Sequence, residues 1–342
     1  MARWKTIGLL AGMVLLVGCH TAPKPSALSR YEFAEPHMGS LWRISLYAPD
    51  PIAASNAVRA AFARVAALDR MMTDYDPESE LMRLSKSPRG VPVEVSGDLF
   101  RILRQSQEIS RISSGAFDVT VGPVVQLWRR ARRQRELPAE ERLEKARLAV
   151  GYGKLALNPR RKTVTLLADN LRLDLGGIAK GYGADEALLV LRRMGLGRAL
   201  VAASGDLAIG DAPPGKPGWR VGIGALDRSE TNLAAMLLLN NAGVSTSGDL
   251  EQSVVLGGVR YSHIVDPRTG CALTNRLQAT IIADCATRSD ALATTVCVLG
   301  AEHGLRLVDS DRKLAACLIL PGSGADPVVL KSRRFSNFEK RN

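Results

Sequence analysis

Residues 173–185 read LDLGGIAKGYGAD, and the change of pattern within them decides the class of fold. A short strand pattern ends at Asp174, two glycines follow, and a helix is predicted over residues 176–194. Because glycine lets a ligand approach the backbone closely, this junction suits a phosphate, a nucleotide or a metal. Lys180 lies one turn into the helix, where its ammonium either meets a phosphate or points into solvent. The chain has no GxGxxG motif and no GxxxxGK followed by Ser or Thr, so neither a Rossmann site nor a P-loop is supported.

Helices and strands elsewhere in the chain do not follow a strict β-α-β order. Helical patterns lie at 52–72, 97–112, 287–299 and 302–308, and two more begin near Pro123 and Pro138. Strand patterns lie at 41–48, 163–167, 171–174, 280–283 and 314–320, at 199–209 with a turn at 204–206, and in short pieces over 219–265. This mixture predicts an α+β fold with no internal repeat and no linker that divides it.

The first nineteen residues have the pattern of an exported lipoprotein. Arg3 and Lys5 precede an apolar stretch at 7–17, which is too short to span a bilayer, and LVGC at 16–19 ends it with a cysteine. We therefore expect a signal peptide at 1–18, a tether at 19–30 lipidated on Cys19, and a folded domain at 31–335. The chain would then lie on the periplasmic side of a bacterial membrane, inner or outer. An uncleaved signal anchor or a chance cysteine is the alternative.

The composition is that of a soluble globular protein with a basic surplus. The formal net charge is +12, and it becomes 12 − 2 = +10 when the two basic residues of the signal peptide are removed. Five arginines lie within RRARRQR at 129–135. Because few aromatic residues accompany them, we expect a solvated helix face or an anionic lipid contact, and no nucleic acid.

The four cysteines after Cys19 give no sign of a metal site. They are Cys271, Cys285, Cys297 and Cys317, and none belongs to a CxxC motif. Outside the cytoplasm they could pair in three ways. Cys297 and Cys317 lie in apolar runs, where they are expected to be buried as small hydrophobic residues.

Residues 289–294, SDALAT, place two oxygen-bearing side chains four positions apart. On a helix, Asp290 and Thr294 would share a face. Carboxylate and hydroxyl oxygens are hard donors of the kind that Mg²⁺ prefers. Taken alone, however, the pair is better explained by an N-terminal cap and a Thr hydroxyl bonded to its own backbone.

Residues 263–270, HIVDPRTG, read as a strand that runs into a turn. His263 is one of only four histidines in the chain, and alone it is better explained by the turn than by an active site. The stretches SGAFDVT at 114–120 and STSGD at 245–249 likewise resemble ordinary glycine-bearing loops. No GxSxG occurs, so a nucleophile elbow is not supported.

Together, these stretches occur in an order that resembles the ApbE family of FAD:protein FMN transferases. The blocks are HMGS at 37–40, DYDPESEL at 74–81, SGAFDVTVGPVVQLW at 114–128, LDLGGIAKGYGAD at 173–185, SGD at 204–206, TSGD at 246–249, HIVDPRTG at 263–270 and SDALATTVCVLG at 289–300. Two departures from the common family pattern are Ser204 before Gly205-Asp206, and Cys271-Ala272 after the DPRTG turn.

The resemblance implies an α+β, ApbE-like (T-fold-related) architecture with antiparallel-rich sheets. It also implies a Mg²⁺-dependent enzyme that transfers FMN from FAD to a Thr or Ser side chain of a target protein through a phosphoester bond, and releases AMP. The family's targets are periplasm-facing subunits of redox-driven ion pumps and related flavoproteins. An FAD diphosphatase that yields FMN and AMP, and a non-catalytic FAD-binding lipoprotein, are the alternatives.

The resemblance further assigns the site by position. It implies FAD contacts from Met38, Tyr75, Ala116, Phe117, Asp118, Asp174, Lys180 and Ile264. Mg²⁺ would be held by Asp290 and Thr294 with the main-chain oxygens of Gly177 and Ala293. His263 would be the general base, since imidazole is suited to proton transfer near neutral pH. Asp266 and Arg268 are expected to shape the turn that follows it.

Overall fold

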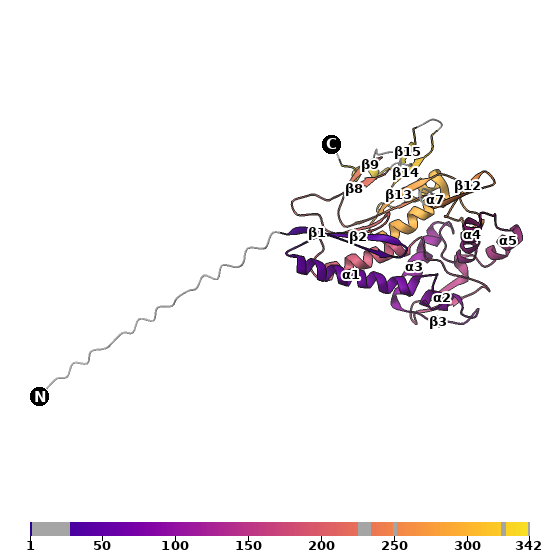
Figure 1. The fold of residues 1–342 in the computed structure, drawn as a ribbon, viewed down its shortest axis with the longest axis horizontal. Coiled ribbons are helices and arrows are strands. Elements are labelled where there is room, and N and C mark those ends of the chain that lie inside the picture. The colour runs from indigo at the N-terminus through magenta and orange to yellow at the C-terminus, as the bar shows by residue number, and fades with distance from the viewer. Residues whose placement is uncertain (2–27, 225–233, 249–251, 323–325, 341–342) are drawn as a thin grey trace.

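An eight-stranded antiparallel sheet forms the centre of the molecule (Figure 1). The computed structural model describes residue 1 and residues 28–224, 234–248, 252–322 and 326–340. The strand order is β1-β2-β6-β7-β10-β13-β14-β15. These strands span Ser29–His37 (β1), Ser40–Ala48 (β2), Ala199–Ala203 (β6), Asp206–Ile209 (β7), Ala242–Ser247 (β10), Gln278–Ala283 (β13), Ala315–Leu320 (β14) and Val328–Lys331 (β15). Every neighbouring pair is antiparallel.

Three smaller sheets surround it. One has three strands in the order β3-β5-β4, and the other two are two-stranded ribbons, β8-β9 and β11-β12. Their bounds are Val93–Glu94 (β3), Leu155–Asn158 (β4), Thr163–Leu166 (β5), Trp219–Ile223 (β8), Ala235–Leu239 (β9), Ser253–Leu256 (β11) and Val259–Ser262 (β12). The β11-β12 ribbon leads directly into His263, so the candidate base lies at the end of a short hairpin.

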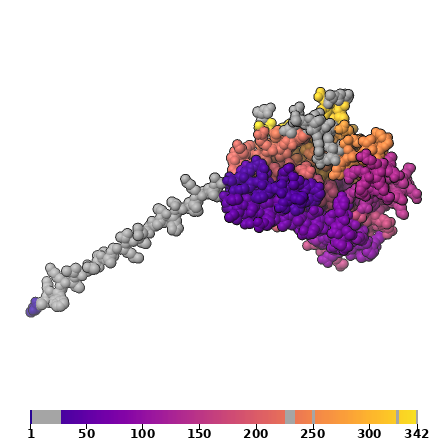
Figure 2. Space-filling view, viewed as in Figure 1, coloured from indigo at the N-terminus to yellow at the C-terminus, as the bar shows by residue number. Residues whose placement is uncertain are grey.

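The helices divide into a central group and a peripheral group (Figure 1). In the central group, α6 (Ala179–Arg193) and α7 (Ala286–Asp309) pack on the sheet, and α1 (Pro51–Met72) packs on α6. The others are α2 (Glu80–Ser85), α3 (Gly97–Ile112), α4 (Gly122–Gln134) and α5 (Glu140–Arg147), with 3-10 turns at Tyr152–Lys154 and Phe335–Asn337. Figure 2 shows the N-terminal segments, in indigo and purple, on the lower face and the C-terminal strands, in orange and yellow, on the upper face.

Burial patterns show that both faces of the sheet are covered. In β2, Trp42, Ile44 and Leu46 are fully buried and alternate with more accessible residues, as expected for a strand with one face in the core. Every residue of β13 is buried, which is typical of a central strand covered on both sides. The helices cover one face, and the β8-β9 ribbon packs with Phe335 against the other.

The crossing of α6 and α7 is unusually close, and it positions the candidate site. A Cβ atom at Gly181 would lie 2.3 Å from the carbonyl oxygen of Ala286, so only glycine permits this approach. Asp185 of α6 caps α7, because its carboxylate accepts hydrogen bonds from the backbone N–H of Ala286 (2.9 Å) and of Thr287 (2.8 Å). The first turn of α7 is therefore fixed relative to α6.

The α+β prediction is confirmed, and several elements match their expected ranges. The helix expected at 97–112 is α3, and the helix expected at 52–72 is α1. The two helices expected at 287–299 and 302–308 are the halves of α7, interrupted at Gly300, where φ is 76° and ψ is 174°. The turn expected at 204–206 joins β6 to β7.

One expected strand is wrong, and others were not predicted. Residues 171–174 form only a single bridge, between Arg172 and Val121, and Asp174 donates its N–H to the Val119 carbonyl. The segment is extended, but its neighbour on the chain, β5, pairs with β3 and β4 instead. Strands β1, β3, β4 and β15 and the short helix α2 were not expected. The helix expected from residue 176 begins at Ala179, because residues 176–178 form a turn.

Two findings bear on the expected domain bounds and membrane attachment. Strand β1 begins at Ser29, inside the expected tether, and the backbone of residues 338–340 still pairs with β9, past the expected end at 335. Helix α7 is long and apolar enough to cross a membrane by length and composition, which was not expected. Half of its most apolar stretch is buried, and the helix packs on β10 and β13, so it is the central core helix of this fold.

Candidate active site

The close crossing of α6 and α7 gathers the four residues proposed to hold Mg²⁺. Asp290 is 3% exposed, and its Oδ2 accepts the Gly181 N–H at 2.9 Å. Gly177 lies against Thr294, since a Cβ added at Gly177 would stand 3.2 Å from Thr294 Oγ1. Ala293 is fully buried between the two side-chain donors on α7. The structure therefore brings together residues that are more than 110 positions apart in the sequence.

The donors at this crossing are hard oxygens and include only one carboxylate of the proposed set. Within the described ranges, no group of three or more His, Cys, Asp or Glu side chains could hold a metal ion. A metal at this crossing would therefore be held by Asp290, the Thr294 hydroxyl and main-chain oxygens, with the remaining positions taken by water or by substrate phosphate. That combination suits Mg²⁺, which keeps several waters and few protein carboxylates.

Lys180 is held at the same crossing by a buried carboxylate. Its ammonium pairs with Asp206, which is 1% exposed and lies at the start of β7. Lys180 is half-buried and paired, and its contact with a phosphate stays a prediction. Burial, followed by the nearby charge of Asp206, raises the pKa of Asp290 to about 8. The crossing thus places the Lys180 ammonium near two buried carboxylates, Asp206 and Asp290.

Apolar residues from three distant segments line the neighbouring region. Ala116, Phe117 and Ile264 are all buried in one hydrophobic cluster. Phe117 also lies next to the residues proposed to hold Mg²⁺, because a Cβ at Gly177 would lie 3.3 Å from Phe117 Cε2. A flat aromatic ring system could pack against such a surface next to the charged crossing.

Two of the implied FAD contacts already have structural partners. The Asp118 carboxylate accepts hydrogen bonds from the backbone N–H (2.8 Å) and the hydroxyl (2.7 Å) of Thr120. Burial raises the pKa of Asp118 above its usual range. Met38 has a φ of 46°, and its N–H donates to Asp69 Oδ2 at 2.8 Å. Neither bond tests the implied contact with FAD, which stays a prediction.

Tyr75 and Asp174 are joined by Arg129, which the sequence did not indicate as a site residue. The Arg129 guanidinium pairs with Asp74 and with Asp174, in the second case at 2.8 Å. Its Cζ lies 5.1 Å from the centre of the Tyr75 ring, a cation–π distance. Burial raises the pKa of Asp174, and the charge of Arg129 opposes that shift. One face of the Tyr75 ring is therefore covered by Arg129, although the residue as a whole is 79% exposed.

His263 lies at the surface, at the end of β12. Its backbone N–H donates to the Gln252 carbonyl at 2.9 Å, and the ring atom Nδ1 lies 3.1 Å from the same oxygen. A carbonyl can only accept a hydrogen bond, so Nδ1 carries a proton.

The turn after His263 is anchored from two sides. Asp266 accepts from Arg268 Nε (2.9 Å) and Nη2 (2.7 Å), which confirms the prediction that these two residues shape the turn. Trp128 of α4 donates its indole N–H to the Gly270 carbonyl at 2.9 Å. Helix α4 therefore contacts the His263 turn through Trp128 and the Tyr75–Asp174 region through Arg129.

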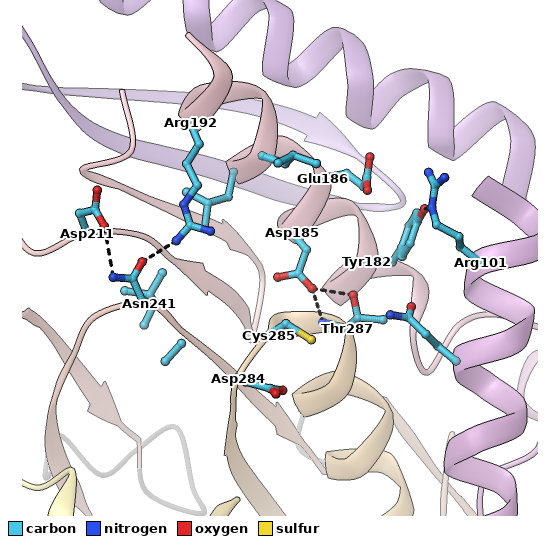
Figure 3. Close-up of a pocket in the computed structure, with 15 residues that line it drawn as sticks. Arg101, Tyr182, Asp185, Glu186, Arg192, Asp211, Asn241, Asp284, Cys285 and Thr287 are labelled. Atoms are coloured by element: carbon cyan, nitrogen blue, oxygen red, sulfur yellow. Dashed lines mark hydrogen bonds between the residues drawn. The ribbon is translucent and has the colours of Figure 1, made fainter. Parts of the chain in front are cut away.

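A further cavity lies outside this region. It has a volume of about 650 Å³ and lies between α3, α6, the start of α7 and the ends of β7 and β10 (Figure 3). None of the residues assigned to FAD or Mg²⁺ lines it. Figure 3 shows Asp185 bonded to Thr287, and Asn241 bonded to Arg192 and Asp211. Several of its polar groups are thus bonded to one another, and burial raises the pKa of its Cys285 thiol to about 12.

Comparison with known proteins agrees with this arrangement. The sequence model of the ApbE family matches residues 38–318. An FAD:protein FMN transferase from Escherichia coli K12 is 31% identical over 341 residues, which cover 97% of this chain and 96% of the relative. A second, from Klebsiella pneumoniae, is 32% identical over 325 residues, which cover 92% of each chain.

Solved structures with the same fold include two ApbE proteins. The ApbE protein of Thermotoga maritima superposes with a TM-score of 0.82 at 28% identity, and the match covers 92% of this chain and 100% of that chain. A histidine-to-glycine variant of the flavin transferase ApbE from Vibrio cholerae gives a TM-score of 0.81 at 25% identity, over 91% of this chain and 99% of that chain. The resemblance seen in the sequence blocks is therefore confirmed, and the chain belongs to the ApbE family.

Proposed function

We propose that the protein transfers FMN from FAD to a Thr or Ser hydroxyl of an acceptor protein and releases AMP, with Mg²⁺ as the metal. The observation that carries this proposal is the α6–α7 crossing, where Asp290, Thr294 and Gly177 converge next to the Lys180–Asp206 pair. The relatives named FAD:protein FMN transferase support the same reaction.

In this reaction the acceptor oxygen forms a bond to the FMN phosphorus as the bond from that phosphorus to the AMP oxygen breaks. Mg²⁺, when bound, would neutralise charge on the diphosphate and on the departing AMP. Lys180 reaches the same region and would stabilise a phosphate oxygen. Asp206 pairs with the Lys180 ammonium and holds it in place.

His263 would remove the proton of the acceptor hydroxyl, because an alcohol is a poor nucleophile until a base takes its proton. The Gln252 carbonyl lies within hydrogen-bond distance of Nδ1, so Nε2 would be the ring atom that takes the proton. The exposed position of His263 lets another protein approach it. Water could approach it as well, which is why FAD diphosphatase activity is the second candidate.

One incubation separates the candidates. The full chain is mixed with FAD, Mg²⁺ and a peptide that carries an acceptor Thr within the short flavinylation motif of the family's targets. Covalent flavin fluorescence on the peptide with one AMP released per label supports the transferase. Free FMN and AMP without label would indicate the diphosphatase, and unchanged FAD would indicate a non-catalytic binding protein.

We also propose that the chain is a periplasmic lipoprotein anchored through Cys19, with a signal peptide at 1–18 and a tether up to residue 30. Residues 2–27 lie outside the described ranges, so this proposal is supported by the sequence pattern alone. Periplasm-facing subunits of redox-driven ion pumps would be its acceptors. Incorporation of labelled palmitate into the full chain, and its loss in Cys19→Ala, tests the anchor.

Arg129→Met is expected to raise the KM for FAD by roughly 10-fold or more, because it breaks the link between Tyr75 and Asp174 and leaves two carboxylates without their cation. The value of kcat should change less than the KM, since Arg129 is a positioning residue. Steady-state kinetics with varied FAD measures both.

Two further variants interpret that result. Arg129→Lys keeps the charge and should recover part of the FAD affinity, whereas Arg133→Met, at an exposed position on the same helix, should leave it unchanged. A loss in kcat with an unaltered KM for FAD would contradict the positioning role.

A further inference from the structure

The C-terminal end of α4 carries a cluster of arginines that form no ion pair. We define the arginine surface as Arg130, Arg132, Arg133 and Arg135. Arg130, Arg133 and Arg135 are exposed, and Arg132 is partly so. None of the four takes part in any ion pair found among the described residues. Glu136 is the only acidic residue between positions 119 and 139.

Such a cluster has an electrostatic cost that the fold does not offset. Like charges three or four positions apart on a helix repel one another. The partial negative charge at a helix C-terminus favours cations there, but its effect is small and is confined to the last turn. An exposed cluster of one sign therefore indicates a partner of the opposite sign.

The arginine surface adjoins the candidate active site. Arg132 Nη1 donates to Gln252 Oε1 at 3.2 Å, and the carbonyl of the same Gln252 accepts the N–H of His263. One turn earlier on α4, Arg129 reaches Asp174. A molecule that lies on the arginine surface would therefore extend naturally toward His263.

The surface also lies far from the expected anchor. Figures 1 and 2 show α4 and α5, in magenta, at one end of the long axis, and the start of β1 toward the opposite end. The expected lipid anchor precedes β1 in the chain, so this separation favours a protein partner over the anionic lipid contact that the sequence had suggested.

We propose that the arginine surface docks an acidic segment of the acceptor protein beside the Thr or Ser that receives FMN. The inference rests on the proposed transferase function and adds the chemistry by which the acceptor is recognised. Complementary charge at the rim of a site speeds encounter and fixes orientation. Because the surface lies outside the α6–α7 crossing, it would act on the acceptor and leave FAD binding unaffected.

The test uses three peptides and two variants of the full chain. The peptides share one acceptor Thr and its motif, and differ only in flanks of three Asp, three Ser or three Lys residues. The test variant is Arg130→Glu with Arg133→Glu and Arg135→Glu, which spares Arg132 because of its contact with Gln252. The control variant changes three exposed basic residues at the β4-β5 turn, Arg160, Arg161 and Lys162, to Glu.

For the wild-type chain, the Asp-flanked peptide should have the lowest KM. The test variant should raise that KM by roughly 10-fold and prefer the Lys-flanked peptide, whereas the KM for FAD stays within about twofold. Raising the salt concentration should remove most of the difference. The control variant should behave as the wild type.

Four outcomes would overturn the proposal. They are equal KM values for the three peptides with wild-type enzyme, an equal effect of the control variant, a change in the KM for FAD alone, or a loss of binding to anionic phosphatidylglycerol vesicles with no change toward peptides. If no peptide is labelled at all, the transferase function fails instead. In that case, fluorescence anisotropy of the same peptides, labelled with a dye, measures their binding and so tests the docking surface without catalysis.

Discussion

His263→Ala is expected to lower the rate of FMN transfer by roughly 10²–10⁴-fold, the usual contribution of a general base. The loss should appear in kcat, because His263 is exposed at the surface and lies outside the α6–α7 crossing. The affinity for FAD, measured by quenching of flavin fluorescence, should change little. Single-turnover labelling of an acceptor peptide measures the rate directly.

His303→Ala is the matched control, since His303 is also exposed and lies on α7 away from the β11-β12 ribbon. It should retain the wild-type transfer rate. Full activity of His263→Ala would exclude this residue as the base. A variant that still cleaves FAD to FMN and AMP, but no longer labels the peptide, would show that His263 serves the acceptor hydroxyl and not diphosphate cleavage.

The metal set shows what the sequence could predict and what it could not. Spacing of four on a helix was enough to place Asp290 and Thr294 on one face. It could not show that Gly177 and Gly181 bring the other helix close enough to share that face. That approach depends on contacts between residues more than 100 positions apart, and only the resemblance to a family supplied them before the structure did.

Arg129 shows a second limit. The run of arginines predicted a solvated face, which is correct for Arg130, Arg133 and Arg135. Arg129 instead points inward to carboxylates 55 and 45 positions away. A helical pattern gives the direction of each side chain only after the packing of the helix is known, so the one inward arginine could not be distinguished from its neighbours.

The edges of the sheets were missed for a related reason. Strands β1 and β15 are edge strands with mostly exposed residues, so their sequences lack the alternation of buried and exposed positions on which strand prediction depends. Residues 171–174 have that alternation but find only one bridging partner. Pairing depends on which strands the topology brings side by side, and local pattern does not contain that information.

Asp290→Asn is expected to abolish the Mg²⁺-dependent reaction, with a fall in rate of at least roughly 10²-fold, because it removes the only carboxylate among the proposed metal ligands. Isothermal titration with MgCl₂ should show binding to the wild type in the presence of FAD and none to the variant. Asp326→Asn, at an exposed position, is the control and should bind as the wild type does. Unchanged Mg²⁺ binding by Asp290→Asn would place the metal elsewhere.

The same residue makes a prediction about pH that does not depend on catalysis. Because burial raises the pKa of Asp290 to about 8, the metal-free folded chain holds a proton there that the unfolded chain has released above roughly pH 4. The free energy of unfolding of the metal-free protein should therefore fall as the pH rises from about 4 to 8, with up to ~1.4 kcal/mol per pH unit from this group.

Mg²⁺ competes with that proton, so its affinity and its stabilising effect should both increase as the pH rises from 6 to 8. Burial also raises the pKa of Asp174 and of Asp185, so the difference between the wild type and Asp290→Asn isolates the contribution of Asp290. Without metal, the variant should lose less stability than the wild type over this range, and Mg²⁺ should no longer raise it. Urea unfolding at pH 6, 7 and 8, with and without MgCl₂, measures the free energy of unfolding of both proteins. The contrary result is a metal-free stability that changes with pH equally in the wild type and in the variant. It would show that Asp290 is already ionised, and that the crossing of α6 and α7 holds its charge without a cation.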